Sequence, residues 1–578
     1  MLKPRALAIV LHPAATIVGS WLLAVSTPTS VLATGAQPVR ARQGMVASQN
    51  FMASQVGIEV LWAGGNAVDA AVATAFALAV THPTAGNIGG GGFLLYRPAT
   101  GDPTAYDFRE TAPAGSSATM FLTAGAYDEK KHHDSHLSVG VPGTVAGLHM
   151  AWRAHGKLPW RRLLAPAITM AREGIVVTPG LSRSLRGVLP EMKPYPASVA
   201  AFSRKGVPYE VGDLLQQTDL AEALERIAER GPAGFYEGKT AELIEAEMKR
   251  GGGLITRADL KAYQPKVRVP LRGTYRGYDV LAMPPISSGG TALIEMLNIL
   301  EGYDLKAKGF GSADTVHLMA EAMRRAYADR ARYLGDPEAN PGLPIARLIS
   351  KDYARSLGAT IDEKKASTSS PSSFQWPAES HETTHLSVID ASRNAVALTF
   401  TLEDGYGSKI VVPGAGFLLN NEMGDFNAGP GLTTAEGLIG TDPNLAAPGK
   451  RMLSSMTPTI LSKDGKVALA VGCLGGRTII NTVLEVIVAF VDFGMNVQEA
   501  IDAPRFHHQW LPDRIRVERY GLSPDTIALL RARGHEVREG EGDYATQGVA
   551  QGVAYDAAAD VLEGGFDRRA SDGAAIGR

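Results

Sequence analysis

The sequence has little cysteine, little net charge and no long apolar run in its main part. Among 578 residues Cys473 is the single cysteine, which excludes an intramolecular disulfide scaffold. Lys plus Arg total 57 and Asp plus Glu total 59, so the formal net charge is −2 and no basic excess points to nucleic acid or anionic lipid. After Gln37 no apolar run can span a bilayer; the most apolar one, Ala67 to Val80, contains Asp69 and is predicted to be a buried helix.

What remains is the composition of an ordinary globular protein. Hydrophobic residues make up 45% of the chain and charged residues 20%, which excludes a wholly disordered or multi-span membrane protein. The 64 glycines and 34 prolines favour a fold with sheets and many tight turns over a helical bundle. Length alone predicts three or four domains of about 150 residues, or one unusually large domain.

The N-terminus has the pattern of a secretory signal. Lys3 and Arg5 precede an apolar stretch, and small residues follow it, as at a signal cleavage site. We expect residues 1–36 to form this signal, with cleavage after Ala33 or Ala36 and export to the periplasm or the extracellular space. An uncleaved membrane anchor is the alternative, because about twenty apolar residues suffice to cross a bilayer.

The next part of the chain mixes helical and strand patterns and ends in a polar segment. Helices are predicted over 146–155, 162–173, 220–230, 240–250, 291–300 and 313–333. Residues 366–373 read A-S-T-S-S-P-S-S, and little up to Glu382 can be buried. This composition predicts an exposed linker.

Strand patterns follow the linker directly. Two hairpins are predicted, one over residues 384–401 and one over 458–471 around the turn Asp464-Gly465. The last strand runs through Gly475-Gly476 into a helical pattern over 477–493. The glycines let backbone N–H groups approach a ligand at a helix start, where negative charge is favoured, so they are candidate oxyanion-hole donors. A simple tight turn is the alternative.

A threonine between an exposed linker and a rigid strand can carry chemistry. In most proteins Thr383 and Thr384 would simply begin the strand. If the chain is cut between Glu382 and Thr383, the new α-amino group, with a pKa of about 7.7–8.0, can take the proton of the hydroxyl on the same residue. Thr401, on the returning strand, is then expected to hydrogen-bond that hydroxyl and orient it.

Two glycine-rich segments look like nucleotide-binding loops but do not fit them. Gly234 to Thr240 has three residues between its glycines where a phosphate loop needs four, and it follows no clear strand. Gly89 to Gly92 lacks the G-x-G-x-x-G spacing and follows a helical pattern. We therefore predict no nucleotide site at either place.

The histidine-rich segment and the cysteine are also given structural interpretations. Residues His132, His133, Asp134 and His136 are expected to lie in a solvated loop, because no second set of metal ligands accompanies them. Cys473 is expected to be a small buried residue, not a catalytic thiol.

A dense set of motifs nevertheless resembles one family. The motifs are His82-Pro83-Thr84-Ala85-Gly86-Asn87, Asp107-Phe108-Arg109-Glu110-Thr111, Val141-Pro142-Gly143-Thr144, Pro284-Pro285-Ile286-Ser287-Ser288-Gly289-Gly290, Thr383-Thr384-His385, Asn420-Asn421-Glu422-Met423-Gly424-Asp425-Phe426, Arg451-Met452-Leu453-Ser454-Ser455-Met456 and Ala503-Pro504-Arg505-Phe506. In collinear order from about Arg42 to the end, they are similar to the γ-glutamyltransferases (γ-glutamyl transpeptidases) of the N-terminal-nucleophile hydrolase superfamily. The resemblance implies an α/β four-layer αββα sandwich, made as one precursor and cleaved into a large subunit (37–382) and a small catalytic subunit (383–578).

The resemblance also assigns roles to individual residues. Thr383 matches the nucleophile that self-cleavage after Glu382 exposes, and Thr401 matches the threonine that hydrogen-bonds it. Gly475 and Gly476 match the oxyanion hole. The remaining matches bind a zwitterion: Arg109, Ser454 and Ser455 its α-carboxylate, and Glu403, Glu422 and Asp425 its α-amino group. A planar guanidinium suits a carboxylate, and acids suit an ammonium.

The implied reaction is hydrolysis or transfer of the γ-glutamyl group of glutathione and related compounds, with water, an amino acid or a dipeptide as acceptor. No metal, cofactor or nucleic acid is expected to take part, and the two subunits are expected to form a heterodimer. Glu403 and Glu422 stand where some members have Asn and Gln, and Glu436 stands where a gating tyrosine is expected, which leaves the balance of hydrolysis and transfer open. A related acylase for glutaryl or cephalosporin amides and a non-catalytic exported binding protein are the alternatives.

Overall fold

The structure, a computed structural model, describes residues 35–369, 383–432, 440–540 and 547–578. Nearly all of the expected signal, most of the linker including Glu382, and Glu436 lie outside the described residues. Among the described residues no helix is both long and apolar enough to cross a bilayer. Residues 37–578 form one compact unit, which is the part of the chain considered below.

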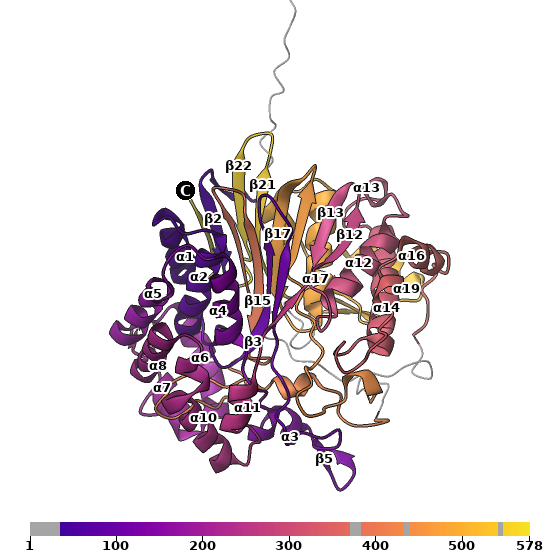
Figure 1. Cartoon of the computed structure of the whole chain (residues 1–578). Helices are drawn as coiled ribbons and strands as arrows, with labels where there is room; N and C mark the ends of the chain where they lie inside the picture. The colour runs from indigo at the N-terminus through magenta and orange to yellow at the C-terminus, as the bar shows by residue number, and fades with distance from the viewer. Residues whose placement is uncertain (1–34, 370–382, 433–439, 541–546) are drawn as a thin grey trace, which may run out of the picture. The chain divides into compact units, whose positions relative to one another are not determined.

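Two seven-stranded sheets form the centre of this unit (Figure 1). The first has the order β11 (Lys266–Arg268), β4 (Thr104–Phe108), β3 (Gly91–Arg97), β15 (Ala395–Thr401), β14 (Thr384–Asp390), β2 (Gly44–Ser48), β23 (Ala574–Gly577). The second has the order β1 (Val39–Ala41), β22 (Val561–Phe566), β21 (Val549–Asp556), β17 (Lys466–Leu474), β16 (Thr459–Lys463), β13 (Tyr278–Ala282), β12 (Leu271–Tyr275). Neighbouring strands are antiparallel throughout both sheets, and β14 and β15 pack face to face against β17.

Helices cover the outer face of each sheet. The first is covered by α1 (Phe51–Trp62), α2 (Ala67–Thr81) and α4 (Thr144–His155), and the second by α12 (Gly289–Leu300), α14 (Ala313–Tyr333) and α17 (Thr478–Val491), as Figure 1 shows. Every residue of α2 is buried, which confirms the predicted buried helix. Apolar side chains fill the space between each helical layer and its sheet. The predicted four-layer αββα sandwich is therefore confirmed.

The remaining elements are short or peripheral. The other helices are α3 (Glu129–His133), α5 (Trp160–Glu173), α6 (Pro179–Met192), α7 (Pro196–Phe202), α8 (Thr218–Arg230), α9 (Ala233–Tyr236), α10 (Gly238–Gly251), α11 (Arg257–Ala262), α13 (Leu305–Lys308), α15 (Ile345–Leu348), α16 (Lys351–Gly358), α18 (Val497–Asp502) and α19 (Pro524–Ala532), with 3-10 turns η1 (His136–Ser138), η2 (Glu422–Asp425) and η3 (Asp442–Asn444). The small strands are β5 (Leu122–Thr123), β6 (Ala126–Tyr127), β7 (Ile175–Val176), β8 (Ser203–Arg204), β9 (Val207–Pro208), β10 (Leu214–Leu215), β18 (Phe506–His507), β19 (Ile515–Val517) and β20 (Val537–Glu539). The predicted helices and hairpins are all present, with ends that differ by a few residues.

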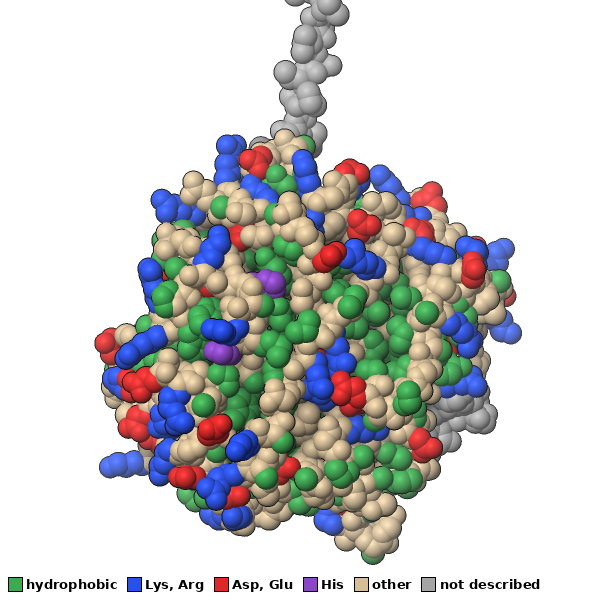
Figure 2. Space-filling model, in the orientation of Figure 1, with side chains coloured by type: hydrophobic (Ala, Val, Ile, Leu, Met, Phe, Trp, Pro, Cys, Tyr) green, Lys and Arg blue, Asp and Glu red, His purple; other side chains and the backbone are tan. Residues whose placement is uncertain are grey.

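Each sheet contains strands from before and from after the linker. The hairpin β14–β15 lies between β2 and β3 of the N-terminal part, and β16 pairs with β13. Each neighbour contributes a full ladder of backbone hydrogen bonds. A cut before Thr383 would therefore leave the two pieces in one shared core. On the face shown in Figure 2, positive and negative side chains are interspersed, in keeping with the near-zero net charge.

The beginning of the polar segment is not exposed as predicted. Ser367 N–H donates to Glu321 Oε1 (3.0 Å), and Ser369 N–H donates to Asp513 Oδ2 (2.7 Å). Ser369 is buried. Composition alone could not show these carboxylate acceptors, which come from distant parts of the chain and hold the segment against the sandwich.

Candidate active site

Thr383 lies at the start of the hairpin that the first sheet holds in place. Thr384 is paired with Phe400, so the antiparallel register places Thr383 opposite Thr401 at the end of β15. Glu403 N–H donates to Thr401 Oγ1 (2.8 Å), and Asn87 Nδ2 donates to the Thr401 carbonyl (2.8 Å). Thr383 and Thr401 line one small cleft. The hydrogen bond between their hydroxyls stays a prediction.

Arg109 follows β4 and points into the same cleft. Its guanidinium is fully buried and forms ion pairs with Glu422 and Asp425, while its Nε donates to the Met452 carbonyl (3.3 Å). Burial opposes the charged form, but Glu422 and Asp425 outweigh burial and raise the pKa of Arg109. The residues assigned to opposite ends of a zwitterion thus contact each other in this structure.

The cleft holds more acids than cations. Burial raises the pKa of Glu422 well above its ordinary value despite Arg109, and burial, with Asp404 and Asp425, does the same for Glu403. Glu403 also has a φ of 82°, a left-handed conformation that costs a non-glycine residue roughly 1–2 kcal/mol. Strain and surplus buried charge together are typical of a binding site and not of a structural core.

Ser454 and Ser455 also line the cleft. Ser454 Oγ accepts a hydrogen bond from Met456 N–H (3.2 Å), and Ser455 Oγ accepts one from Arg330 Nη2 (3.0 Å). Arg330, on α14, also donates through Nε to Ser288 Oγ (2.7 Å), and Ser288 Oγ donates to the Ser454 carbonyl (2.6 Å). Sequence reasoning missed Arg330, because no local pattern marks a helix arginine that reaches a distant serine.

The strand–glycine–helix unit is present as predicted. Gly475 and Gly476 join β17 to α17 with φ values of 130° and 54°, a region that favours glycine. A Cβ on Gly475 would lie 2.4 Å from Thr478 Oγ1. Gly476 lines the same cleft as Thr383, and a role of this turn as oxyanion hole stays a prediction.

The two glycine-rich segments adopt local structures other than a phosphate-binding loop at a helix start. Gly234 lies within the short helix α9, and Gly91 begins a strand, not a helix. Cys473 is buried and donates to the Ile479 carbonyl (3.4 Å), and burial raises the pKa of its thiol. A thiol in this environment is a packing residue.

The prediction of a solvated histidine loop is wrong. His132 is buried, with its ring nitrogens beside Tyr127 Oη (3.1 Å) and the Met423 carbonyl (3.2 Å). His136 is buried against Glu247 (2.9 Å). His133 lies 3.5 Å from Glu403, which lines the cleft. The polar composition of the segment hid these contacts, because all of their partners except Tyr127 are distant in sequence.

Comparisons with known proteins agree with this geometry. A family model described as Gamma-glutamyltranspeptidase matches residues 53–577. The "Glutathione hydrolase proenzyme" of Escherichia coli (strain K12) is 51% identical over 520 residues, covering 89% of each chain, and the "Acylase ACY 1 proenzyme" of Pseudomonas sp. (strain V22) is 39% identical over 514 residues, covering 87% of this chain and 88% of that one. The solved cephalosporin acylase from Bacillus halodurans superposes with a TM-score of 0.82 at 29% identity, covering 94% of this chain and 97% of that one.

The family model therefore matches nearly the whole chain, and one cleft is lined by the threonine, the arginine and the acids expected from the motifs. The protein belongs to the γ-glutamyltranspeptidase family.

Proposed function

We propose that this protein hydrolyses and transfers the γ-glutamyl group of glutathione and related amides, with Thr383 as N-terminal nucleophile. The observation that carries the proposal is the lining of one small cleft by Thr383, Thr401, Arg109 and three acids. The related glutathione hydrolase proenzymes, at 51% and 45% identity, support it.

Maturation begins at the bond between Glu382 and Thr383. The Thr383 hydroxyl attacks the Glu382 carbonyl, the peptide nitrogen leaves as the new α-amino group, and water hydrolyses the resulting ester. The large subunit then comprises residues 37–382 and the small one residues 383–578. Each sheet combines strands of both subunits, and this pairing holds the heterodimer together without a disulfide.

Catalysis follows a ping-pong course. The Thr383 α-amino group takes the hydroxyl proton, and Oγ1 attacks the γ-glutamyl carbonyl. The Gly475–Gly476 turn stabilises the oxyanion, and the amine leaves with a proton from the α-ammonium. Water, an amino acid or a dipeptide then attacks the γ-glutamyl ester and regenerates the hydroxyl.

The surplus acids favour an amino-acid substrate. Arg109, Ser454 and Ser455 bind the α-carboxylate, which replaces part of the contact between Arg109 and Asp425, the more exposed of its two main partners. The substrate ammonium then binds to the carboxylate of Asp425 so released and to those of Glu403 and Glu422. A glutaryl group carries no ammonium and would leave these buried acids uncompensated, so the acylase alternative fits the cleft less well.

We also propose that the protein is exported to the periplasm or the extracellular space after removal of residues 1–36. The motivation is the Lys3 and Arg5 pair followed by the apolar stretch and small residues. Mass analysis of the N-terminus of the mature protein tests this, and a chain that keeps Met1 would contradict it.

The Thr383→Ala variant tests the nucleophile. We expect it to stay one uncleaved chain without measurable turnover of a γ-glutamyl anilide, because the same hydroxyl starts self-cleavage and catalysis. Thr383→Ser is the matched control, since it keeps a hydroxyl and should still be cleaved. Efficient cleavage of Thr383→Ala would refute the assignment, and faster hydrolysis of a glutaryl than of a γ-glutamyl anilide by the wild type would favour the acylase.

A further inference from the structure

We propose that His133, Glu403 and Asp404 form a binding site for a divalent transition-metal ion of the Zn²⁺ type, which adjoins the cleft through Glu403. One ligand atom from each of these three residues lies within 4.8 Å of the others. A histidine nitrogen and two carboxylate oxygens are ligands that Zn²⁺ accepts, with a fourth position left for water.

The spacing of the first two ligands fits an ion between them. His133 Nδ1 lies 3.5 Å from Glu403 Oε1. Two ligands bound to a tetrahedral zinc at about 2.0–2.1 Å are about 3.3–3.4 Å apart. The pair is therefore too far apart for a good hydrogen bond and close to the separation that a shared metal ion imposes.

Glu403 indicates that a cation binds here, and a metal ion and the substrate ammonium both meet this requirement. Its side chain is only 3% exposed, and neither of its oxygens accepts a hydrogen bond from any described residue. Leaving a buried carboxylate in this state is costly unless a cation joins it.

The ligand atoms converge on a space above one glycine. A Cβ built on Gly424 would lie 2.5 Å from His133 Nδ1 and 2.6 and 2.7 Å from the two oxygens of Glu403. The glycine thus leaves a cradle that a methyl group would fill.

Asp404, the third ligand, is oriented by a hydrogen bond and is accessible from solvent. Asn421 Nδ2 donates to Asp404 Oδ2 (2.8 Å), the kind of outer contact that fixes a ligating carboxylate. The Lys409 ammonium lies 3.8 Å from Asp404, but it is shared with Asp134 (3.9 Å) and Glu191 (3.7 Å). The side chain of Asp404 is 29% exposed, so an ion can enter from its side.

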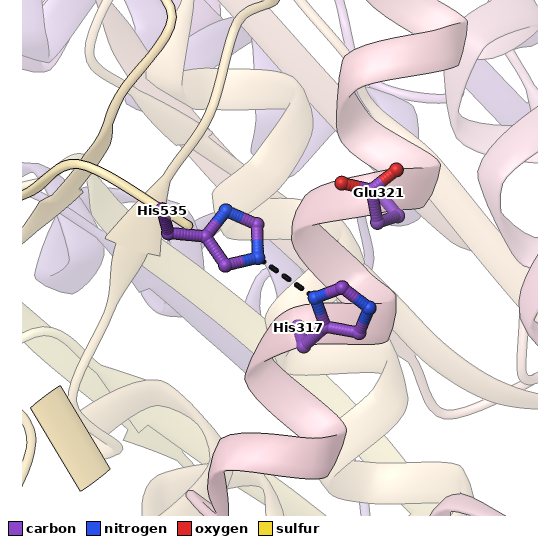
Figure 3. A group of neighbouring side chains, drawn as sticks. All are labelled: His317, Glu321 and His535. Carbon is purple, nitrogen blue, oxygen red and sulfur yellow. Dashed lines mark hydrogen bonds between the residues drawn. The ribbon is translucent and has the colours of Figure 1, made fainter. Parts of the chain in front are cut away.

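A second histidine–acid cluster in the sandwich lacks these features. His317 Nδ1 and His535 Nε2 are only 2.7 Å apart and share a hydrogen bond, as Figure 3 shows. Glu321 is engaged by Arg324, by Arg325 and by Ser367 N–H. This cluster is satisfied by protein groups and serves as the control.

Occupation of the proposed site would affect substrate binding. Glu403 lines the catalytic cleft, so an ion bound to it would compete with the ammonium of the substrate. This consequence rests on the proposed function, whereas metal binding itself does not.

Calorimetric titration of the mature protein with ZnCl₂ tests the site. We expect one Zn²⁺ per heterodimer in the wild type, binding at least about 10-fold weaker in His133→Gln and in Gly424→Ala, and unchanged binding in His535→Gln. Gly424→Ala keeps all three ligands but pushes them apart. Absence of saturable binding, equal affinity in His133→Gln, or loss of binding in His535→Gln would overturn the proposal.

Kinetics separate the metal site from the catalytic proposal. With a γ-glutamyl anilide, Zn²⁺ should raise KM and leave kcat unchanged in the wild type, with the effect reduced in His133→Gln. Inhibition of kcat alone would contradict overlap with the ammonium position. If the anilide is not turned over, the proposed function fails while the titration still decides the metal site.

Discussion

The cleft and the network around α14 both bury several charged side chains, but they balance them differently. Around α14, Glu321 meets two arginines, and Asp513 meets Arg324 and His508. In the cleft Arg109 stands among Glu422, Asp425 and Glu110, and Glu403 lies beyond them. Buried carboxylates that pair with arginines stabilise the fold, whereas an excess of buried carboxylates over cations leaves room to bind a cationic ligand.

The pKa shifts follow this difference. Burial tends to raise the pKa of Glu321, but Arg324, Ser367 and Arg325 outweigh it and lower the pKa to about 2. In the cleft burial dominates, and the pKa of Glu403 lies well above its ordinary value. The same residue type therefore stabilises the fold in one region and destabilises it in the other.

Glu321→Gln gives the largest expected change in stability. Removing the charge leaves Arg324 and Arg325 without their buried partner, which we expect to cost about 3 kcal/mol of unfolding free energy. Urea denaturation of the mature protein measures this. An unchanged unfolding midpoint would show that the network is not structural.

Arg109→Lys gives the largest expected change in activity short of losing the nucleophile. The variant should mature, but a lysine cannot form the two parallel hydrogen bonds to the α-carboxylate. We therefore expect KM for a γ-glutamyl anilide to rise about 100-fold, which corresponds to about 2.7 kcal/mol of binding free energy. Arg324→Lys is the control, with a lower unfolding midpoint and an unchanged KM. Normal kinetics of Arg109→Lys would remove it from the carboxylate site.

Glu403→Gln should act in opposite directions on stability and activity. Loss of a surplus buried charge should stabilise the fold by about 1 kcal/mol, while weaker binding of the substrate ammonium raises KM about 10-fold. Denaturation and steady-state kinetics on the same sample measure both. A less stable Glu403→Gln with unchanged KM would place Glu403 with the structural acids.

The pH dependence of these two variants should differ in sign. The raised pKa of Glu403 means that folding is opposed increasingly above the unfolded-state value of about 4.5, so the stability advantage of Glu403→Gln should grow from pH 5 to 8. The lowered pKa of Glu321 gives stability that is present above that value and lost as pH falls toward about 2. The loss of stability that Glu321→Gln causes relative to the wild type should therefore become smaller below pH 4. Parallel pH trends in both variants would contradict the contrast.

Much of the fold and of the cleft could be predicted from sequence, but only where the signal is local. The hairpin at Thr383, the Gly475–Gly476 turn and the buried helix α2 follow from patterning, and the motifs around Arg109 and Asp425 place the cleft. Each of these features is determined within a short stretch of sequence, so it can be predicted without knowing contacts to distant segments.

The remainder depends on contacts between distant segments. Nothing near Arg330 shows that it supports Ser455, and nothing near His133 shows that it faces Glu403. The direct contact between Arg109 and the acids also appears only when the segment after β4 meets the turn η2. Composition described these residues as polar, but the fold decides whether a polar residue is paired.

Intact-mass measurement of the purified wild-type protein tests the central claim most directly. The account predicts two chains that stay together until denatured, with the smaller beginning at Thr383 and ending at Arg578. A single chain containing the Glu382–Thr383 bond in a protein that turns over γ-glutamyl anilide, or a small chain with any other first residue, would contradict it.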